Sequence, residues 1–291
     1  MDKEMREQLV KTIPLRHSVR KFLPEPLPDE LTERVAGFFA GLEPPFGHNA
    51  RIVPFKAEPG KKLYNNGINP VDNLAVMAET DLASVSKAGF VGELVMLYAV
   101  SMGLSACWFG HYKLSEVGRY IEGIATADRI RESTLGYGYG KQVDVGERVI
   151  CCMPFGRDDE QTRRLVDVVA GRNGAKRKPL EELLENPELL GSIPADIKEA
   201  LELAKLAPSA ANSQMWRFGS SDGFQTVTVA KPVGYKHFKW EHPDVDVGMC
   251  AAHLWLGLLE KGYSPTVDVR VDADRAFWSF DCSDAADGRD R

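Results

Sequence analysis

The sequence predicts an α+β protein built from two related halves, and two features predict the duplication. The segments 89–103 and 248–262 are equal in length, are apolar almost all round, and begin and end at glycine. A helix of this kind is buried on every side, so the pair indicates a seam between two halves. An Asn and a Phe recur at the same separation, at 49–55 and at 212–218, each time after a helix-like segment that proline ends. We expect each half to hold a central sheet flanked by helices, with the apolar helices at the seam.

Hydrophobic periodicity and turn residues predict the remaining elements in chain order. Helices are expected at 1–13, 29–41 and 195–206, and strands at 147–154, 225–230 and 266–271. Turns are expected at 22–28 and 136–141, a polar linker at 182–194, and a frayed end at 281–291. We place the first half at residues 1–180 and the second, shorter half at 181–291.

Composition limits the classes of protein that the chain can belong to. Its 291 residues, 44% of them hydrophobic, suffice for a substantial core. A net charge of -6, without a concentrated basic face, argues against a nucleic-acid partner. The charged segment 1–13 has no apolar core of signal-peptide length, and we expect no membrane-spanning segment, no membrane partner and a cytoplasmic location. Five cysteines without a C-x-x-C pair indicate reduced thiols and no metal site.

The segment after the 195–206 helix has the features of a ligand cradle. Its proline ends the helix, and the small residues that follow would let a flat ligand approach the backbone. Two amide side chains then offer both donors and acceptors. An ordinary helix exit with solvated amides is the alternative reading of the same residues. The candidate residues are Pro208, Ser209, Ala210, Asn212 and Gln214.

A second candidate lies near the N-terminus, where Arg16, Ser18 and Arg20 alternate with other residues. In an extended arm these three side chains would point to one side, with His17 and Val19 on the other. Two guanidinium groups and a hydroxyl suit a terminal phosphate, because forked donors bind its oxygens in pairs. Taken alone, the same residues would also fit a solvated basic turn.

Together, the segments 16–22 and 207–218 resemble the nitroreductase family of FMN-dependent oxidoreductases. In that family an Arg-x-Ser-x-Arg-x-Phe arm and an Ala-Pro-Ser-x-x-Asn-x-Gln-x-Trp-x-Phe segment line the flavin from different subunits of a dimer. The segment 104–112 is similar to the family's Gly-Leu-Gly-Thr-Cys-Trp-x-Gly stretch, which implies that the backbone of Phe109 and Gly110 lies near the flavin N5 edge. The segment 172–183 is similar to a basic stretch that implies a phosphate contact for Arg177.

The resemblance combined with the duplication implies one site per chain. The first half keeps the arm but has 46–49 in place of the cradle, whereas the second keeps the cradle but has no arginine between 181 and 193. We therefore expect one FMN per chain and a monomer that acts as an internal pseudo-dimer. His253, in the second apolar helix, is interpreted as a core histidine with a satisfied hydrogen bond rather than as a metal ligand.

The implied activity is a ping-pong reaction in which NAD(P)H reduces FMN, and the flavin then reduces a nitroaromatic, a quinone or a similar small acceptor. The chemistry would belong to FMN, so no catalytic side chain is predicted. Two alternatives remain. One is a different reaction on the same fold, such as dehalogenation or flavin fragmentation, and the other is a flavin-binding or interaction protein without turnover.

Overall fold

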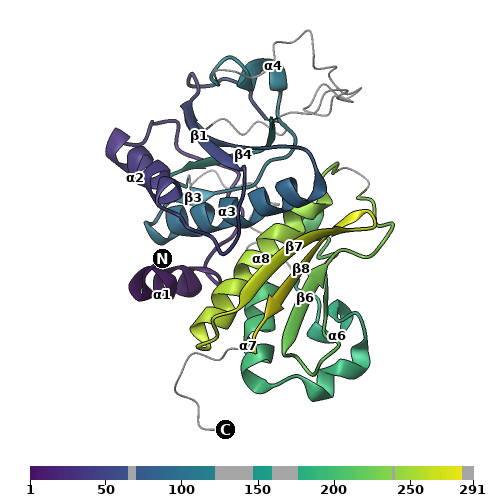
Figure 1. Ribbon diagram of the computed structural model, residues 1–291. Coiled ribbons are helices and arrows are strands. Elements are labelled where there is room, and N and C mark those ends of the chain that lie inside the picture. The colour runs from purple at the N-terminus through teal and green to yellow at the C-terminus, as the bar shows by residue number, and fades with distance from the viewer. Residues whose placement is uncertain (65–69, 122–146, 159–175, 238–239, 284–291) are drawn as a thin grey trace.

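Two four-stranded antiparallel sheets lie on either side of a pair of long central helices in the computed structural model (Figure 1). The structure describes residues 1–64, 70–121, 147–158, 176–237 and 240–283. The predicted α+β fold of two fused halves is confirmed. All strands of one sheet precede residue 180, and all strands of the other follow it.

In the first half the elements are α1 (Lys3–Thr12), α2 (Asp29–Ala40), β1 (Arg51–Lys56), β2 (Asp72–Ala78), α3 (Leu82–Ser101), β3 (Ser105–Ala106), α4 (Leu114–Val117) and β4 (Arg148–Gly156). In the second half they are α6 (Leu180–Leu183), the 3-10 helix η4 (Pro187–Ser192), α7 (Ala195–Ala204), the 3-10 helix η5 (Ala210–Asn212), β5 (Arg217–Gly219), β6 (Thr226–Ala230), α8 (Pro243–Glu260), β7 (Thr266–Asp272) and β8 (Arg275–Asp281).

The two sheets have the same connectivity. The first has the order β1-β2-β4-β3, and the second has the order β5-β6-β8-β7, so each strand has a counterpart at the same place. The ends of the central helices also correspond. Gly103 follows α3 and Gly262 follows α8, and both have a φ of 81°, which glycine adopts without the strain that other residues would incur. The duplication thus extends to individual backbone conformations.

The central helices cross at a pair of glycines. A Cβ on Gly89 of α3 would lie 2.1 Å from the carbonyl oxygen of Val245, and one on Gly248 of α8 would lie 1.8 Å from that of Ser86. Each glycine therefore faces a carbonyl of the opposite helix that lies three residues before that helix's own glycine. A two-fold relation between the halves requires this reciprocal arrangement. Only residues without a Cβ allow the backbones to approach this closely.

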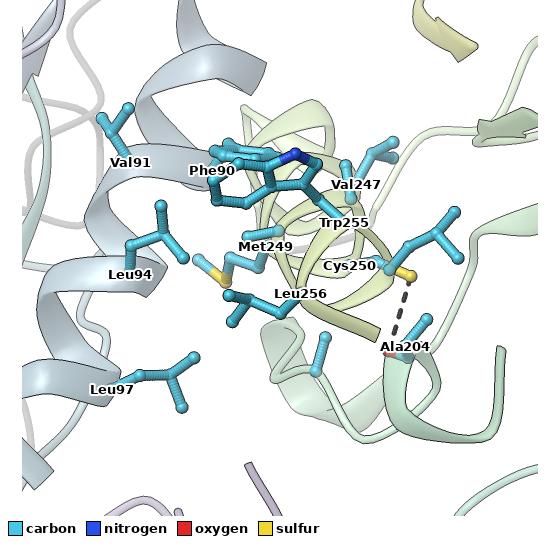
Figure 2. Packing of buried hydrophobic residues seen from close by; sticks show 14 of the residues in the cluster. Phe90, Val91, Leu94, Leu97, Ala204, Val247, Met249, Cys250, Trp255 and Leu256 are labelled. Atoms are coloured by element: carbon cyan, nitrogen blue, oxygen red, sulfur yellow. Dashed lines mark hydrogen bonds between the residues drawn. The ribbon is translucent and has the colours of Figure 1, made fainter. Parts of the chain in front are cut away.

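Away from the crossing, large side chains fill the seam. Figure 2 shows Phe90, Leu94 and Leu97 of α3 facing Met249 and Leu256 of α8. These side chains are at most 2% exposed. On the other side of α8, the Cys250 thiol lies 3.6 Å from the carbonyl oxygen of Ala204, at the end of α7. The five cysteines are all buried and free, as expected for reduced thiols.

By length and composition, α3 could cross a membrane, which corrects the expectation that no segment reaches that span. Here 72% of its apolar window is buried within the protein. Its apolar surface is therefore covered by the rest of the chain.

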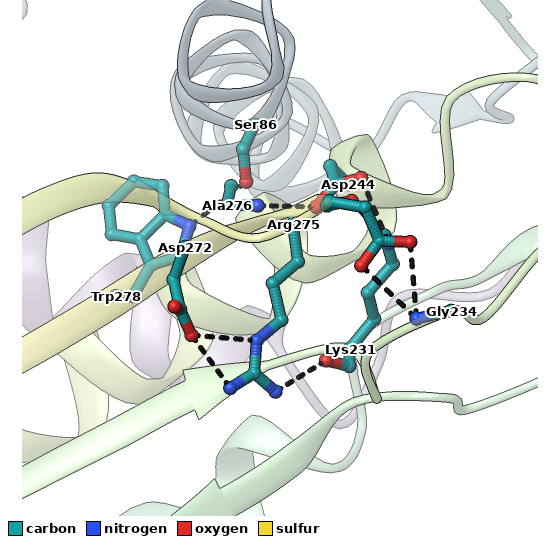
Figure 3. A network of polar contacts seen from close by, with 9 residues as sticks. Ser86, Lys231, Gly234, Asp244, Asp272, Arg275, Ala276 and Trp278 are labelled. Carbon is teal, nitrogen blue, oxygen red and sulfur yellow. Dashed lines mark hydrogen bonds and ion pairs between the residues drawn. The ribbon is translucent and has the colours of Figure 1, made fainter.

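A buried polar network anchors the N-terminal end of α8 to the second sheet (Figure 3). The Nζ of Lys231, at the end of β6, lies 3.9 Å from Asp244 of α8 and 3.5 Å from Asp274 in the β7–β8 turn. Asp244 also accepts a hydrogen bond from the N–H of Ala276 at 2.7 Å. Across the seam, the indole of Trp278 donates to Ser86 of α3 at 2.9 Å.

Several element boundaries differ from the prediction for local reasons. Helix α3 begins at Leu82 because the side chain of Asp81 caps it by accepting the N–H of Ser84, and α8 begins at Pro243, a favoured first residue. The expected linker at 182–194 contains η4, and β8 extends to Asp281, where fraying was expected. The predicted turn at 136–141 lies outside the described residues.

Candidate functional site

The N-terminal arm begins directly against the end of α1 and lies along β3. The backbone N–H of Arg16 donates to the carbonyl of Thr12, at the end of α1, at 3.0 Å. Ser18 then forms a parallel bridge with Ala106 of β3, whose carbonyl accepts the N–H of Val19 at 3.1 Å. This bridge holds Ser18 half-buried at the sheet edge, and Arg20 is also half-buried. Val19 is buried whereas His17 is exposed, so the two do not share one environment as the alternation predicted.

Arg16 is held in a buried polar cluster at the seam. Its side chain is only 4% exposed, and its Nε lies 3.7 Å from the Oε1 of Glu93, which is completely buried on α3. The other contacts of Glu93 are a hydrogen bond from the indole of Trp108 at 2.7 Å and one with His253 Nε2 on α8 at 2.9 Å. His253 is thus a core histidine whose Nε2 bonds Glu93, as interpreted, but its buried Nδ1 has no hydrogen-bond partner among the described residues. The Nη1 of Arg16 is buried and has no hydrogen-bond partner in the part of the chain that the structure describes.

The second arginine, Arg177, caps the end of α7. The helix ends at Ala204, and in the turn before Pro208 the carbonyl groups of Leu206 and Ala207 need donors from elsewhere. The guanidinium donates to these carbonyls, with Nη2 2.8 Å from Leu206 O and Nη1 2.7 Å from Ala207 O. Burial and then the nearby charge of Arg16 lower the pKa of Arg177 to about 10. Two of the three arginines predicted to bind phosphate, Arg16 and Arg177, therefore interact electrostatically.

The predicted amide side chains tie the cradle to the segment that carries Arg177. Asn212 accepts a hydrogen bond from Arg177 at 3.3 Å and donates to Lys176 O at 3.1 Å. Gln214 is 2% exposed, accepts from the N–H of Lys178 at 2.9 Å, and donates to Lys176 O at 3.0 Å. The sequence predicted that these amides read a ligand, whereas in the structure they join two stretches of chain into one unit.

The cradle backbone adopts strained conformations that its contacts maintain. Ala211, Asn212 and Gln214 have φ values of 50°, 54° and 46°, in the left-handed region that residues other than glycine rarely adopt. The hydroxyl of Ser209 accepts the N–H of Gln214 at 3.0 Å. The N–H of Ala210 donates to the buried carboxylate of Asp246 on α8 at 2.8 Å.

The predicted flavin edge at Phe109 and Gly110 is engaged by the protein itself. The N–H of Phe109 donates to the carbonyl of Cys152 in β4 at 2.8 Å, so it is not available to a ligand in this structure. A Cβ on Gly110 would lie 2.2 Å from the ring of Trp240. The close approach that Gly110 permits is therefore made by an indole ring, which differs from the expected approach by a flavin.

Several residues of the site were not predicted from the sequence. Glu93 could have been noticed as an acidic residue in an otherwise apolar helix, and Asp246 as another on α8. No local pattern predicts that Trp108 donates to Glu93 or that Trp240 covers Gly110. Burial raises the pKa of Asp246 to about 7, and this effect is partly offset by the Ala210 N–H and by Trp240.

The residues present fit the phosphate end of FMN. Arg16 is a buried cation whose charge acts on the half-buried Arg177, and Glu93 is the carboxylate in contact with Arg16. Buried charges need partners, and the Nη1 of Arg16 lacks one among the described residues. An anionic group of high charge would supply it.

Among solved structures, this chain is similar to one described as a "putative nitroreductase" from Thermotoga maritima, with 20% identity and a TM-score of 0.57 over 95% of this chain and 94% of that one. This likeness shows a shared fold. Weaker likenesses include a nitroreductase family protein from Clostridium difficile (12% identity, TM-score 0.40, 61% of this chain and 96% of that one). Another is a nitroreductase with bound FMN from Bacteroides fragilis (15% identity, TM-score 0.36, 54% of this chain and 91% of that one). No curated protein sequence matches this chain significantly.

The fold and the comparisons together define the class of protein as an oxidoreductase with a nitroreductase-like fold. The model of the family described as "Putative TM nitroreductase" matches residues 8–126 and 135–258, which is more than half of the chain. The chain therefore belongs to this nitroreductase family.

Proposed function

We propose that this protein is an FMN-dependent oxidoreductase that uses NAD(P)H to reduce nitroaromatics, quinones or similar small acceptors. The observation that carries the proposal is the buried Arg16 at the seam, whose Nη1 lacks a partner among the described residues, together with the half-buried Arg177. Family membership and the FMN bound by a nitroreductase of the same fold support the choice of cofactor.

In this proposal the chain's own residues bind and orient the cofactor. Arg16 and Arg177 would hold the phosphate, with Arg20 and Ser18 beside it on the arm. Ser209 and Ala210 would shape the cradle, and Asn212 and Gln214 would keep the cradle joined to Arg177. When bound, FMN would supply the transfer of two electrons from NAD(P)H to the acceptor.

We also propose that each chain contains one such site and does not need a second chain to complete it. The arm comes from the first half and the cradle from the second, and Arg177 contacts the cradle directly. Micromolar binding of FMN requires about 8 kcal/mol, to which charge-assisted hydrogen bonds contribute about 1.5–3 kcal/mol each.

The test is a visible spectrum of the purified protein, with the flavin released by denaturation, identified and counted. We expect FMN at close to one per chain, together with quinone-dependent oxidation of NADH or NADPH. No flavin after incubation with excess FMN would overturn the proposal. Two per chain would overturn the single site, and bound FMN without acceptor-dependent turnover would favour a binding protein.

A further inference from the structure

The seam between the halves is symmetric in its backbone but not in its polar groups. Glu93 lies four residues after Gly89, and the equivalent place after Gly248 is held by Ala252. His253 lies five residues after Gly248, where the other helix has Leu94. The pair of Glu93 and His253 therefore has no counterpart at the equivalent positions, and Glu93 contacts Arg16 of the arm. The crossing of the helices does not itself need a carboxylate. This asymmetry assigns Glu93 to the site rather than to helix packing.

Glu93 is held in place by groups that do not depend on its charge. The indole of Trp108 donates to Oε2 at 2.7 Å, and His253 bonds Oε1 at 2.9 Å. The Nε of Arg16, by contrast, is 3.7 Å from Oε1, which is a contact between charges rather than a hydrogen bond. A glutamine could keep both contacts by accepting from Trp108 and donating to His253 Nε2, with the imidazole protonated at Nδ1, and it would remove the charge.

We propose that Glu93 is the built-in counter-ion of Arg16 and that it determines how strongly the site prefers a phosphorylated ligand over the same ligand without phosphate. The proposal rests on the proposed function, because the ligand is taken to be FMN. Without a phosphate, Glu93 balances part of the buried positive charge. With a phosphate bound, it repels that group, because two like charges a few ångströms apart in a protein interior interact strongly.

The experiment compares wild type with Glu93→Gln in two assays. In the first, thermal unfolding of the flavin-free protein is followed while inorganic phosphate is titrated. In the second, the dissociation constants of FMN and riboflavin are measured by quenching of flavin fluorescence. Asp244→Asn is the matched control, since it neutralises another buried carboxylate, on α8, that accepts a backbone N–H and lies beside Lys231.

For Glu93→Gln we expect an FMN affinity about tenfold higher relative to riboflavin, and phosphate stabilisation at about tenfold lower concentration. Asp244→Asn is expected to leave the FMN-to-riboflavin ratio unchanged. A purely structural role would change both flavin affinities by the same factor, and that result would overturn the inference. If neither flavin binds, the proposed function fails, but the phosphate titration still decides the role of Glu93.

Two further variants keep the inference testable if Glu93→Gln does not fold. The double variant Arg16→Gln/Glu93→Gln removes both charges, so it should fold and should prefer FMN over riboflavin more than Arg16→Gln alone does. A double variant with no greater preference for FMN than Arg16→Gln would overturn the inference. Glu93→Asp keeps the charge and is expected to retain the wild-type ratio.

Discussion

In both halves, a side chain of the central helix forms a hydrogen bond with the turn that follows the proline-ended helix. The helix side chain is the acceptor in one half and the donor in the other. In the second half, Asp246 accepts the N–H of Ala210 at 2.8 Å. In the first half, Lys87 donates to the carbonyl of Gly47 at 2.9 Å. Asp246 and Lys87 each lie two residues before the crossing glycine of their helix. One half therefore fastens its turn with a buried carboxylate and the other with a half-buried ammonium.

The residues around these turns also differ, being polar in the second half and aromatic in the first. Three residues before Asn212 is Ser209, whose hydroxyl supports the cradle, and three residues before Asn49 is Phe46. The centre of the Phe46 ring lies 4.9 Å from that of Phe90 and 5.2 Å from that of Trp278. The duplicated backbone has thus been kept in both halves, while polar contacts hold one turn and aromatic packing surrounds its counterpart.

The largest effect is expected where the two halves are still equivalent, at the crossing glycines. A methyl group at Gly248 would meet the carbonyl oxygen of Ser86 at 1.8 Å, and backbone atoms cannot move aside cheaply. We expect Gly248→Ala to lower the free energy of unfolding by about 3 kcal/mol or more, and Gly89→Ala to do nearly the same. Urea denaturation measures both. Gly191→Ala, where nothing lies within 4 Å, should change stability by less than about 0.5 kcal/mol.

The next effect concerns Arg177, which joins the halves at the proposed site. Arg177→Gln removes hydrogen bonds to Leu206 O and Ala207 O as well as one proposed phosphate contact. We expect FMN affinity to fall by about 100-fold, since hydrogen bonds to charged groups contribute about 1.5–3 kcal/mol each. Fluorescence titration of FMN measures the loss. Arg51→Gln, at an exposed arginine paired with Glu147, is the control, and an equal loss there would contradict a specific role for Arg177.

Asp246 makes the second half sensitive to pH. Burial raises the pKa of Asp246 from 3.8 to about 7, so the folded protein binds more protons than the unfolded chain between these values. The stability contribution of this group therefore falls as the pH rises through this window and is constant above about pH 7. Asp244, whose pKa burial raises to about 6, acts in the same direction.

Asp246→Asn should remove the contribution of Asp246 to the pH dependence of stability, while the asparagine oxygen can still accept the Ala210 N–H. We expect the variant to be more stable than wild type by roughly 3 kcal/mol at pH 8, with the difference shrinking as the pH falls and vanishing near pH 4. Urea denaturation at a series of pH values measures this. A difference that grows toward low pH would show that the sign is wrong.

The parts of the fold that were predictable from the sequence are those with a local signal. The two apolar helices are recognisable because burial on all sides leaves few polar residues in 89–103 and 248–262, and the recurring Asn and Phe indicate the duplication. Strand β8 was missed because its sequence, Arg275–Asp281, alternates but runs into an Asp-rich tail that suggests fraying. Its order comes from pairing with β6 and β7, which are distant in sequence.

The same limit applies to the candidate site. Arg16, Arg177 and Asn212 were predicted, and the structure brings their segments together. The partners of Glu93 could not be predicted, because Trp108 lies in the segment after β3 and His253 lies on α8. The contacts of Gln214 with Lys176 and Lys178 could not be predicted, because an amide that binds a ligand and an amide that joins two loops have the same chemistry.

The smallest effect is expected at the first-half counterpart of Asp246. Lys87→Met keeps the apolar stem but removes the hydrogen bond to Gly47 O and the placement of the ammonium 5.6 Å from the centre of the Phe46 ring. We expect a loss of about 0.5–1 kcal/mol in the free energy of unfolding, because a half-buried lysine is largely compensated by water. FMN affinity and stoichiometry should stay as in wild type, since this turn is the first-half counterpart of the cradle and carries none of the predicted binding residues. A Lys87→Met protein that binds FMN more weakly would indicate that the first-half turn takes part in binding, and the functional contrast between the halves would then have to be abandoned.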